Sequence, residues 1–287
     1  MSDPEESVGG TTPSDRIIGG RYRLGARRGI GLDIAIFEAT DLLTERIVAV
    51  KILHPEICAA PGFAERFTTT IEQVMRTRHP NLVEVVGAGA ATWNDQPVHY
   101  VVCENLNGGS LRDLRDRGRE LSPSQAVMIA LDVCRGLDVA HRAGLVHGDI
   151  RPGNLVFGDD GRIRVADLGL ATLVAGESSG EAASMSIDRA RYASPEQAKS
   201  QPVGQKSDVY ALCLCIIEAV TGSLPFAGES TVATLSNRVD RLMPVSADLG
   251  PLAAVLERAG RPEPGDRYTA SEFGRALVQA AEKLPRP

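Results

Sequence analysis

Apolar residues in the first third of the chain form short runs that are rich in Val and Ile. Residues 46–53, RIVAVKIL, and residues 98–104, VHYVVCE, have the β-branched content and the length of buried strands. Residues 63–79 lie between them and place four apolar side chains at helical spacing: Phe67, Ile71, Val74 and Met75. This part of the chain is therefore predicted to be a sheet with one main helix.

The pattern becomes helical after the sequence Asn-Gly-Gly that ends at residue 109. One helix is predicted to begin after Ser122, because Ser122 and Gln125 form a capping-box pair and Pro123 suits the first helical position. Gly144 is a plausible stop for this helix, because glycine readily adopts the left-handed backbone that ends helices. A long helix is therefore expected early in the second part of the chain.

Three further helices and a hairpin are predicted beyond it. One helix, apolar nearly all round, is expected to be capped by Ser207 and to end at Gly222, so it should be buried. Residues 154–166 surround the turn sequence GDDG and read as a β-hairpin. Amphipathic helices are expected near residues 251–259 and 269–283.

These elements predict an α+β fold with two lobes. Residues 21–104 are expected to form a β-rich lobe with one main helix, and residues 105–284 an α-helical lobe. Residues 1–20 read as a disordered acidic tail, because they are rich in Gly, Ser, Pro and acidic residues. They also lack the basic and apolar regions of a signal peptide.

Composition limits the classes of binding partner and the cellular compartment that we expect for this chain. The net charge is −6, and 43% of the 287 residues are hydrophobic, so neither nucleic acid nor a membrane surface is expected as a partner. No apolar run approaches the roughly 20 residues that span a membrane. A membrane tether is expected only if a longer protein continues past residue 287. The five cysteines form no CxxC pair and read as reduced thiols, which predicts a cytoplasmic location.

Oxygen-bearing side chains gather in two short motifs that follow strand-like runs. The loop HGDIRPGN, residues 147–154, contains Asp149 and Asn154, and Asp167 begins the motif DLG. Asp149 is a candidate for orienting an attacking hydroxyl group, and Asn154 and Asp167 are hard oxygen ligands that suit Mg²⁺. Together these three residues predict phosphoryl-transfer chemistry.

The strand-rich part of the chain contains candidate phosphate contacts. Lys51 lies in an apolar strand, where an ammonium group needs an anionic partner, so we expect it to face a phosphate. Gly29 and Gly31 would let backbone amides approach phosphates closely, although this pair alone could equally form a plain hairpin turn.

From about Arg21 to Lys283 the chain resembles the eukaryotic-like serine/threonine protein kinases, especially the bacterial ones. The resemblance implies ATP-dependent transfer of the γ-phosphate to hydroxyl groups of proteins, with Mg²⁺ or alternatively Mn²⁺, and a protein substrate or signalling partner. The matching motifs occur in the order of that family. They are the glycine pair, VAVK ending at Lys51, HPNLV at 79–83, HGDIRPGN at 147–154, DLG at 167–169, SPE at 194–196 and SDVYAL at 207–212.

The resemblance also implies roles for single residues. Asp149 would be the catalytic base, aided by Arg151, while Asn154 and Asp167 would bind the metal and Lys51 the α- and β-phosphates. The remaining contacts would surround adenine: backbone groups of Glu104 and Leu106, the side chains of Ala49 and Val156, and Cys103 as a small gatekeeper residue. Glu196 and Arg267 would form a structural ion pair.

Several positions depart from the kinase pattern, and some of them organise the active state. The family's third loop glycine is Ile34, its helix glutamate is Thr70, and the arginine of its catalytic loop is Gly148. Glu72 is close to Thr70 in sequence, but two positions along a helix point it to a different face. The family's Gly-Thr before SPE is Asp188-Arg189, which removes the hydroxyl group that usually contacts the catalytic aspartate, and its catalytic-loop lysine is Arg151.

Three hypotheses follow. The favoured one is an active protein kinase with atypical regulation, because the residues that would touch the metal and the proton are all present. The second is a pseudokinase that serves as a nucleotide-binding or scaffolding module. The third, a small-molecule phosphotransferase, rests on the local likeness of HGDxxPGN to aminoglycoside and choline phosphotransferases. It ranks last, because those enzymes lack the SPE-closed segment and the DLGLA sequence found here.

Overall fold

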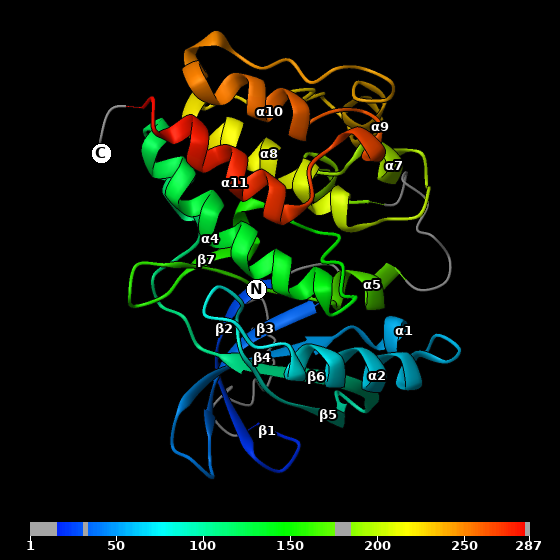
Figure 1. Ribbon diagram of the computed structural model, residues 1–287. Coiled ribbons are helices and arrows are strands. Elements are labelled where there is room, and N and C mark those ends of the chain that lie inside the picture. Colours follow the sequence, from blue (N-terminus) through cyan, green and yellow to red (C-terminus); the bar gives the residue numbers. More distant parts are fainter. Residues whose placement is uncertain (1–15, 31–33, 176–184, 285–287) are drawn as a thin grey trace, which may run out of the picture. The chain divides into compact units, whose positions relative to one another are not determined.

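A computed structural model describes residues 16–30, 34–175 and 185–284 of the chain (Figure 1). Its contacts divide the protein into two compact units. The first comprises the chain up to Ala64 together with Val85–Asn105, and the second comprises Glu65–Glu84 together with the chain from Leu106 onward. The domain boundaries expected at residues 20 and 104 remain predictions. Gly31 lies outside the described residues.

The first unit is built on an antiparallel six-stranded sheet with the order β1-β2-β3-β4-β6-β5. Its elements are β1 (Ile17–Ile18), β2 (Tyr22–Ile30), β3 (Ile34–Asp41), β4 (Ile47–Leu53), the short helix α1 (Pro55–Cys58), β5 (Val85–Trp93) and β6 (Gln96–Glu104). Strands β4 and β6 confirm the two Val-rich strands predicted from the sequence.

Apolar side chains from several strands fill one core of the first unit. Val50 of β4 and Val102 of β6 face each other in register and are fully buried. Tyr22 and Tyr100 pack edge to face beside them, with ring centroids 6.1 Å apart. This burial of β-branched and aromatic side chains fixes the register of the strands.

The second unit is mainly helical and includes a small two-stranded sheet (Figure 1). Its elements are α2 (Phe63–Arg76, of which the first two residues belong to the first unit), α3 (Leu111–Asp116), α4 (Pro123–Arg142), η2 (Pro152–Asn154), β7 (Leu155–Phe157), β8 (Ile163–Val165), α5 (Leu170–Ala175), α6 (Ile187–Ala190), α7 (Pro195–Ala198), α8 (Gln205–Thr221), α9 (Thr231–Ser236), η4 (Ala247–Leu252), α10 (Ala253–Ala259), η5 (Pro264–Asp266) and α11 (Ala270–Ala281). The predicted α+β class is thereby confirmed.

Helix α2 has the face that its sequence predicts. Phe67, Ile71 and Val74 are buried, whereas Met75 is only partly buried. Glu72 points elsewhere: it is exposed and forms an ion pair with Arg76, one helical turn further on. Thr70 is partly buried and its Cγ2 atom faces Gly169, so the prediction that Glu72 points to a different face from Thr70 is confirmed.

Helices α4 and α8 lie at the centre of the second unit, and α11 runs alongside α4 (Figure 1). The capping box of α4 is confirmed, because the Ser122 hydroxyl group accepts from the Gln125 amide and the Gln125 side chain accepts from the Ser122 amide. Gly222 ends α8 in the left-handed conformation, as expected.

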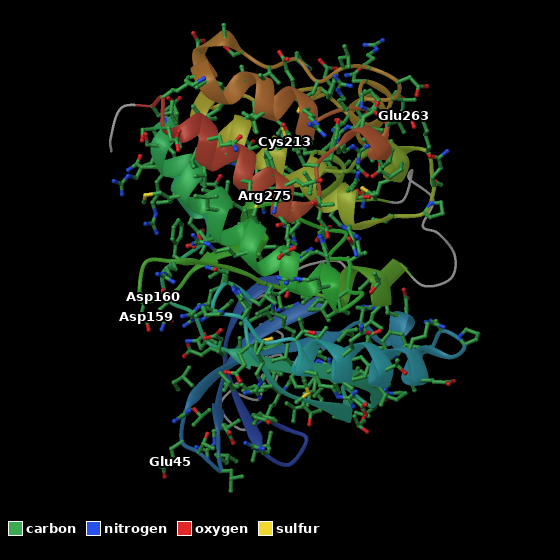
Figure 2. All side chains as sticks on the ribbon, viewed as in Figure 1. Glu45, Asp159, Asp160, Cys213, Glu263 and Arg275 are labelled. Carbon is green, nitrogen blue, oxygen red and sulfur yellow. The ribbon has the colours of Figure 1, made fainter. Side chains whose placement is uncertain are left out.

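The predicted cap of α8 was placed three residues too late. The helix begins at Gln205 with Gly204 as its N-cap, and the Ser207 hydroxyl group accepts from the Gly204 amide at 3.1 Å. Ser207 thus caps from inside the first turn, because its side chain reaches back to the amide that precedes the helix. Cys213 lies in the middle of α8 (Figure 2), where burial raises the pKa of its thiol, so it is a core residue.

None of the helices among the described residues is long and apolar enough to cross a membrane.

Candidate active site

The loop of residues 147–154 is fixed to the buried helix α8 through Asp208. Its carboxylate accepts from the amide of His147 at 3.0 Å and from the amide of Gly148 at 2.8 Å. His141 of α4 approaches the same carboxylate, with its Nε2 atom at 2.8 Å. Because Asp208 is fully buried, these contacts satisfy its charge and hold the loop backbone in one place.

His147 connects the loop to the strand that precedes Asp167. Its Nε2 atom lies 2.6 Å from the carbonyl oxygen of Ala166, which can only accept, so Nε2 carries the proton. The Nδ1 atom then accepts from the amide of Asp149 at 3.2 Å. This buried histidine is therefore a structural link between the two candidate motifs.

Asn154 and Asp167 lie at the same end of the β7–β8 hairpin. Asn154 immediately precedes β7, and Asp167 is the second residue after β8. The amide of Ala166, which lies between β8 and Asp167, donates to the carbonyl oxygen of Asn154 at 2.8 Å. The side-chain amide of Asn154 donates to the backbone oxygen of Asp149 at 2.8 Å and to its Oδ2 atom at 3.2 Å. The Oδ1 atom of Asn154 is left as its acceptor, so the donor set fits a hard cation such as Mg²⁺.

Two arginine side chains hold the Asp149 carboxylate. Arg151 donates from Nε to Oδ2 at 3.1 Å, and Arg189 donates from Nε to Oδ1 at 3.3 Å. The sequence showed only that a hydroxyl group was missing at position 189. It could not show that the arginine would reach Asp149, because the two residues are 40 positions apart in the chain.

A second ion pair lies beside this group. Arg112 of α3 contacts Asp188 of α6 at 2.6 Å. Burial alone would raise the pKa of Asp188, but the hydrogen bond from Arg112 and the charges of Arg112, Arg151 and Arg191 hold it below its ordinary value. Asp188 therefore stays ionised among several guanidinium groups.

The predicted nucleotide contacts of the first unit lie on neighbouring strands. Ala49 is paired with Cys103 in register, and Val48 is paired with Glu104. Lys51 lies two residues after Ala49 on β4 and is buried, as its apolar surroundings predicted. Gly29 of β2 is paired with Ile36 of β3. The sheet thus places Ala49, Cys103 and Glu104 at one end of the β4–β6 pair.

Leu106 and Val156 belong to the second unit. Val156 lies in β7, opposite Arg164 of β8, and a bridge joins it to Ser110 before α3. Leu106 is partly buried near the start of this unit. Val156 is likewise partly buried.

Close packing explains why the last residue of the DLG motif is a glycine. Gly169 has a φ of +79°, and a Cβ atom added there would lie 2.9 Å from Cγ2 of Thr70 and 3.0 Å from Cγ2 of Val74. Helix α2 and the residues after Asp167 are therefore packed too closely for any other residue type. Thr70 occupies the position where the kinase resemblance implies a glutamate.

The structural ion pair implied by the resemblance is confirmed. Arg267 donates to both carboxylate oxygens of Glu196, each at 2.8 Å, and both side chains are almost completely buried. The hydroxyl group of Ser207 also donates to Glu196. A bidentate arginine with additional hydrogen bonds is the geometry that a buried charge requires.

Comparisons with known proteins agree with this architecture. Residues 22–273 match the family model described as the protein kinase domain, so the chain belongs to the protein kinase family. Protein kinases in general use ATP and a divalent metal and act on protein substrates.

Individual relatives are bacterial. The chain is 37% identical over 272 residues to a probable serine/threonine-protein kinase of Corynebacterium efficiens, covering 91% of this chain and 41% of that protein. It is 34% identical over 286 residues to the serine/threonine-protein kinase PknB of Mycobacterium tuberculosis, covering 96% and 45%. The chain thus spans less than half the length of these curated relatives.

A solved structure shows the same fold. The kinase domain of PknI from Mycobacterium tuberculosis superposes with a TM-score of 0.74 at 25% identity, covering 95% of this chain and 100% of that one. The predicted architecture, a β-rich part with one main helix and a helical part, is therefore confirmed as the protein kinase fold.

Proposed function

We propose that this domain is a serine/threonine protein kinase that transfers the γ-phosphate of ATP to hydroxyl groups of proteins. The observation that carries the proposal is the anchored group of Asp149, Asn154 and Asp167. Asp208 and His147 fix the loop of Asp149, and hydrogen bonds join that loop to the hairpin end that bears Asn154 and Asp167. Such positioning is the main contribution that a protein makes to phosphoryl transfer.

In this proposal each group has one task. Asp149 orients the substrate hydroxyl group and accepts its proton, and Arg151 balances the charge of that carboxylate. Asn154 and Asp167 hold Mg²⁺, or alternatively Mn²⁺. When bound, the metal neutralises negative charge on the phosphates. The side-chain nitrogen of Asn154 donates to Asp149, so its Oδ1 atom is the one that would bind the metal.

The nucleotide contacts follow from the same proposal. Lys51 contacts the α- and β-phosphates, and the backbone around Gly29 and Gly31 covers the phosphates. Five residues contact adenine: Ala49, Cys103, Glu104, Leu106 and Val156. The support is the placement of Ala49, Cys103 and Glu104 at one end of the β4–β6 pair and the burial of Lys51 within β4.

We further propose that the domain works in the cytoplasm, where ATP is available and thiols stay reduced. All five cysteines are free thiols. If the natural protein continues past residue 287, a membrane tether in that continuation is compatible with this location.

A second candidate function is nucleotide binding without catalysis. One observation favours it: Thr70 replaces the expected helix glutamate, and Glu72 is engaged by Arg76 on the exposed face of α2. A kinase needs a lysine–glutamate pair for full activity. The two candidates differ in their need for Asp149, because nucleotide binding alone requires no proton acceptor.

Transfer of label from radioactive ATP to a generic protein substrate separates these functions. We expect Mg²⁺-dependent transfer by the wild type and a loss of about 10²- to 10⁴-fold in Asp149→Asn. Asp159→Asn, in the exposed turn between β7 and β8 (Figure 2), is the matched control and should behave like the wild type. Equal label in the wild type and Asp149→Asn would exclude the kinase. If Mg-ATP then still raised the melting temperature, the second candidate, nucleotide binding without catalysis, would remain. If Mg-ATP did not raise the melting temperature, both candidate functions would be excluded.

A further inference from the structure

Two arginine side chains, Arg151 and Arg189, contact the carboxylate of the candidate base Asp149. Two more, Arg112 and Arg191, act on Asp188, which precedes Arg189 in the sequence. We call these four side chains the arginine cluster. They come from α3, the catalytic loop, α6 and the residues just after α6. The side chains of Arg151 and Arg189 are each 24% exposed and that of Arg112 is 30% exposed, so solvent and ligands can reach them.

Within the residues that the structure describes, the cluster carries more positive charge than its neighbours neutralise. Three carboxylates of this part of the chain act on it: Asp149 and Asp188 through ion pairs, and Asp167 through its charge on Arg151. Four arginines against three aspartates leave one net positive charge, and the proposed function assigns Asp167 to the metal. Arg191 acts on Asp188 through charge without an ion pair between them in the described part of the chain. The cluster therefore suits a further anionic partner.

The contact between Arg189 and Asp149 is a weak one. It is a single hydrogen bond from Nε at 3.3 Å, whereas Arg267 uses two nitrogens at 2.8 Å each in its buried pair with Glu196. Partly exposed ion pairs with one contact contribute little stability, since water can replace either partner. Arg189 can therefore leave Asp149 at low cost when a better acceptor arrives.

While Arg189 stays in place, it impedes the reaction. The Nε atom of Arg189 donates to Oδ1 of Asp149, and Arg151 and Asn154 donate to Oδ2. Both carboxylate oxygens therefore already accept hydrogen bonds. A substrate hydroxyl group must compete with these donors.

We propose that Arg189 and Arg191 select protein substrates with an acidic residue beside the phosphorylated Ser or Thr. The acidic side chain offers Arg189 a bidentate partner, draws it off Asp149 and thereby frees Oδ1 for the substrate hydroxyl group. Arg189 is then a specificity-determining and positioning residue for the proposed kinase, on which this inference rests.

The test compares two peptides that differ only in Glu or Gln next to the same Thr. For the wild type we expect kcat/KM to favour the Glu peptide by roughly fivefold, the size of an exposed ion pair of about 1 kcal/mol. The preference should shrink between about 50 mM and about 500 mM NaCl, since salt screens exposed charges. Arg189→Lys should keep only part of it, because an ammonium group keeps the charge but cannot pair with a carboxylate bidentately.

Substitution of Arg189 should act mainly on the Gln peptide. Arg189→Thr should reduce the preference to nearly one, mainly by raising kcat for the Gln peptide, because Asp149 is no longer held. Arg191→Gln should also lower the preference, because it should raise KM for the Glu peptide. The control is Arg142→Gln on the outer part of α4, where Arg142 is mostly exposed and pairs with Asp138, and it should change neither peptide.

Several results would overturn the inference. An unchanged preference in Arg189→Thr would do so, and equal losses on both peptides would show that Arg189 handles the phosphoryl group instead. If Arg189→Thr does not fold, the wild type alone decides. The inference is overturned if kcat/KM of the wild type does not favour the Glu peptide, or if that preference does not change with salt. Transfer that does not depend on Asp149 for either peptide would overturn the proposed function as well. Dependence on Asp149 therefore distinguishes a failure of the proposed function from a failure of the specificity inference alone.

Discussion

Gly148 holds the loop of residues 147–154 in place through its backbone alone. Its amide donates to Asp208, and its carbonyl oxygen accepts from Gln197 of α7 at 2.9 Å. Between these two contacts its φ is +71°, in the left-handed region that glycine adopts without strain. The position where the kinase resemblance implies an arginine thus has a relaxed backbone and no side chain to read a phosphate.

This conformation gives a stability prediction for Gly148→Ala. An added Cβ would meet only ordinary contacts, 3.7 Å from Cβ of Ala171 and 3.8 Å from Cγ1 of Val203, so the cost is that of the backbone. We expect the free energy of unfolding to fall by about 1 kcal/mol. Gly265→Ala is the control, because open space surrounds its Cβ position and its φ lies outside the left-handed region.

Urea unfolding followed by circular dichroism measures both variants. Gly265→Ala should be neutral or slightly stabilising, since alanine lowers the entropy of the unfolded chain at a compatible position. Equal effects of the two substitutions would show that position 148 is not under backbone constraint.

At the scale of elements, one buried ion pair joins three parts of the second unit. Glu196 lies in α7, Ser207 in the first turn of α8, and Arg267 directly after η5. Arg267 also donates to the carbonyl oxygens of Lys206, Arg261 and Pro262, so all five N–H donors of its guanidinium group are used. The orientation of the segment that ends in SPE therefore depends on two buried charged groups, the Glu196 carboxylate and the Arg267 guanidinium group.

We expect Glu196→Gln to lower the free energy of unfolding by about 3 kcal/mol or more, because it leaves the Arg267 charge buried without its counterion. The matched control is Glu72→Gln on α2, whose pair with Arg76 is exposed and should contribute under about 0.5 kcal/mol. Thermal or urea unfolding at neutral pH compares the two. A change in Glu196→Gln as small as that in Glu72→Gln would show that the pair adds no net stability.

At the scale of the whole molecule, local patterns could be predicted from the residues themselves, whereas a long-range contact, the pair of Glu196 and Arg267, was predicted only through the family resemblance. Strands β4 and β6 and the capping box at Ser122 depend on neighbours in sequence, and all three were predicted. Strand β5, VVGAGAATW, escaped prediction because its small residues lack the usual Val and Ile content. The contact of Arg189 with Asp149 joins distant segments, and only the folded chain reveals it.

The first unit has an acid-sensitive contact at one end of its sheet. The pKa of Asp41 lies well below its ordinary value because Arg21 donates to both of its oxygens at 2.7 Å, an effect that burial opposes and that Thr44 and the Leu43 amide reinforce. A carboxylate with a lowered pKa in the folded state stabilises the fold above its unfolded pKa of about 3.9. That contribution is lost as the pH falls through the lower folded value.

We therefore expect Asp41→Asn to be less stable than the wild type at pH 7, with the difference shrinking as the pH falls below about 4. Trp93, the only tryptophan, packs edge to face against Phe37 of the same sheet, so its fluorescence reports unfolding of this unit. Urea titrations at a series of pH values give the two curves. Asp95→Asn, at the exposed β5–β6 turn, is the chemically identical control and should run parallel to the wild type. A gap between Asp41→Asn and the wild type that stays constant from neutral to acidic pH would show that the Arg21–Asp41 contact is not the acid-sensitive element.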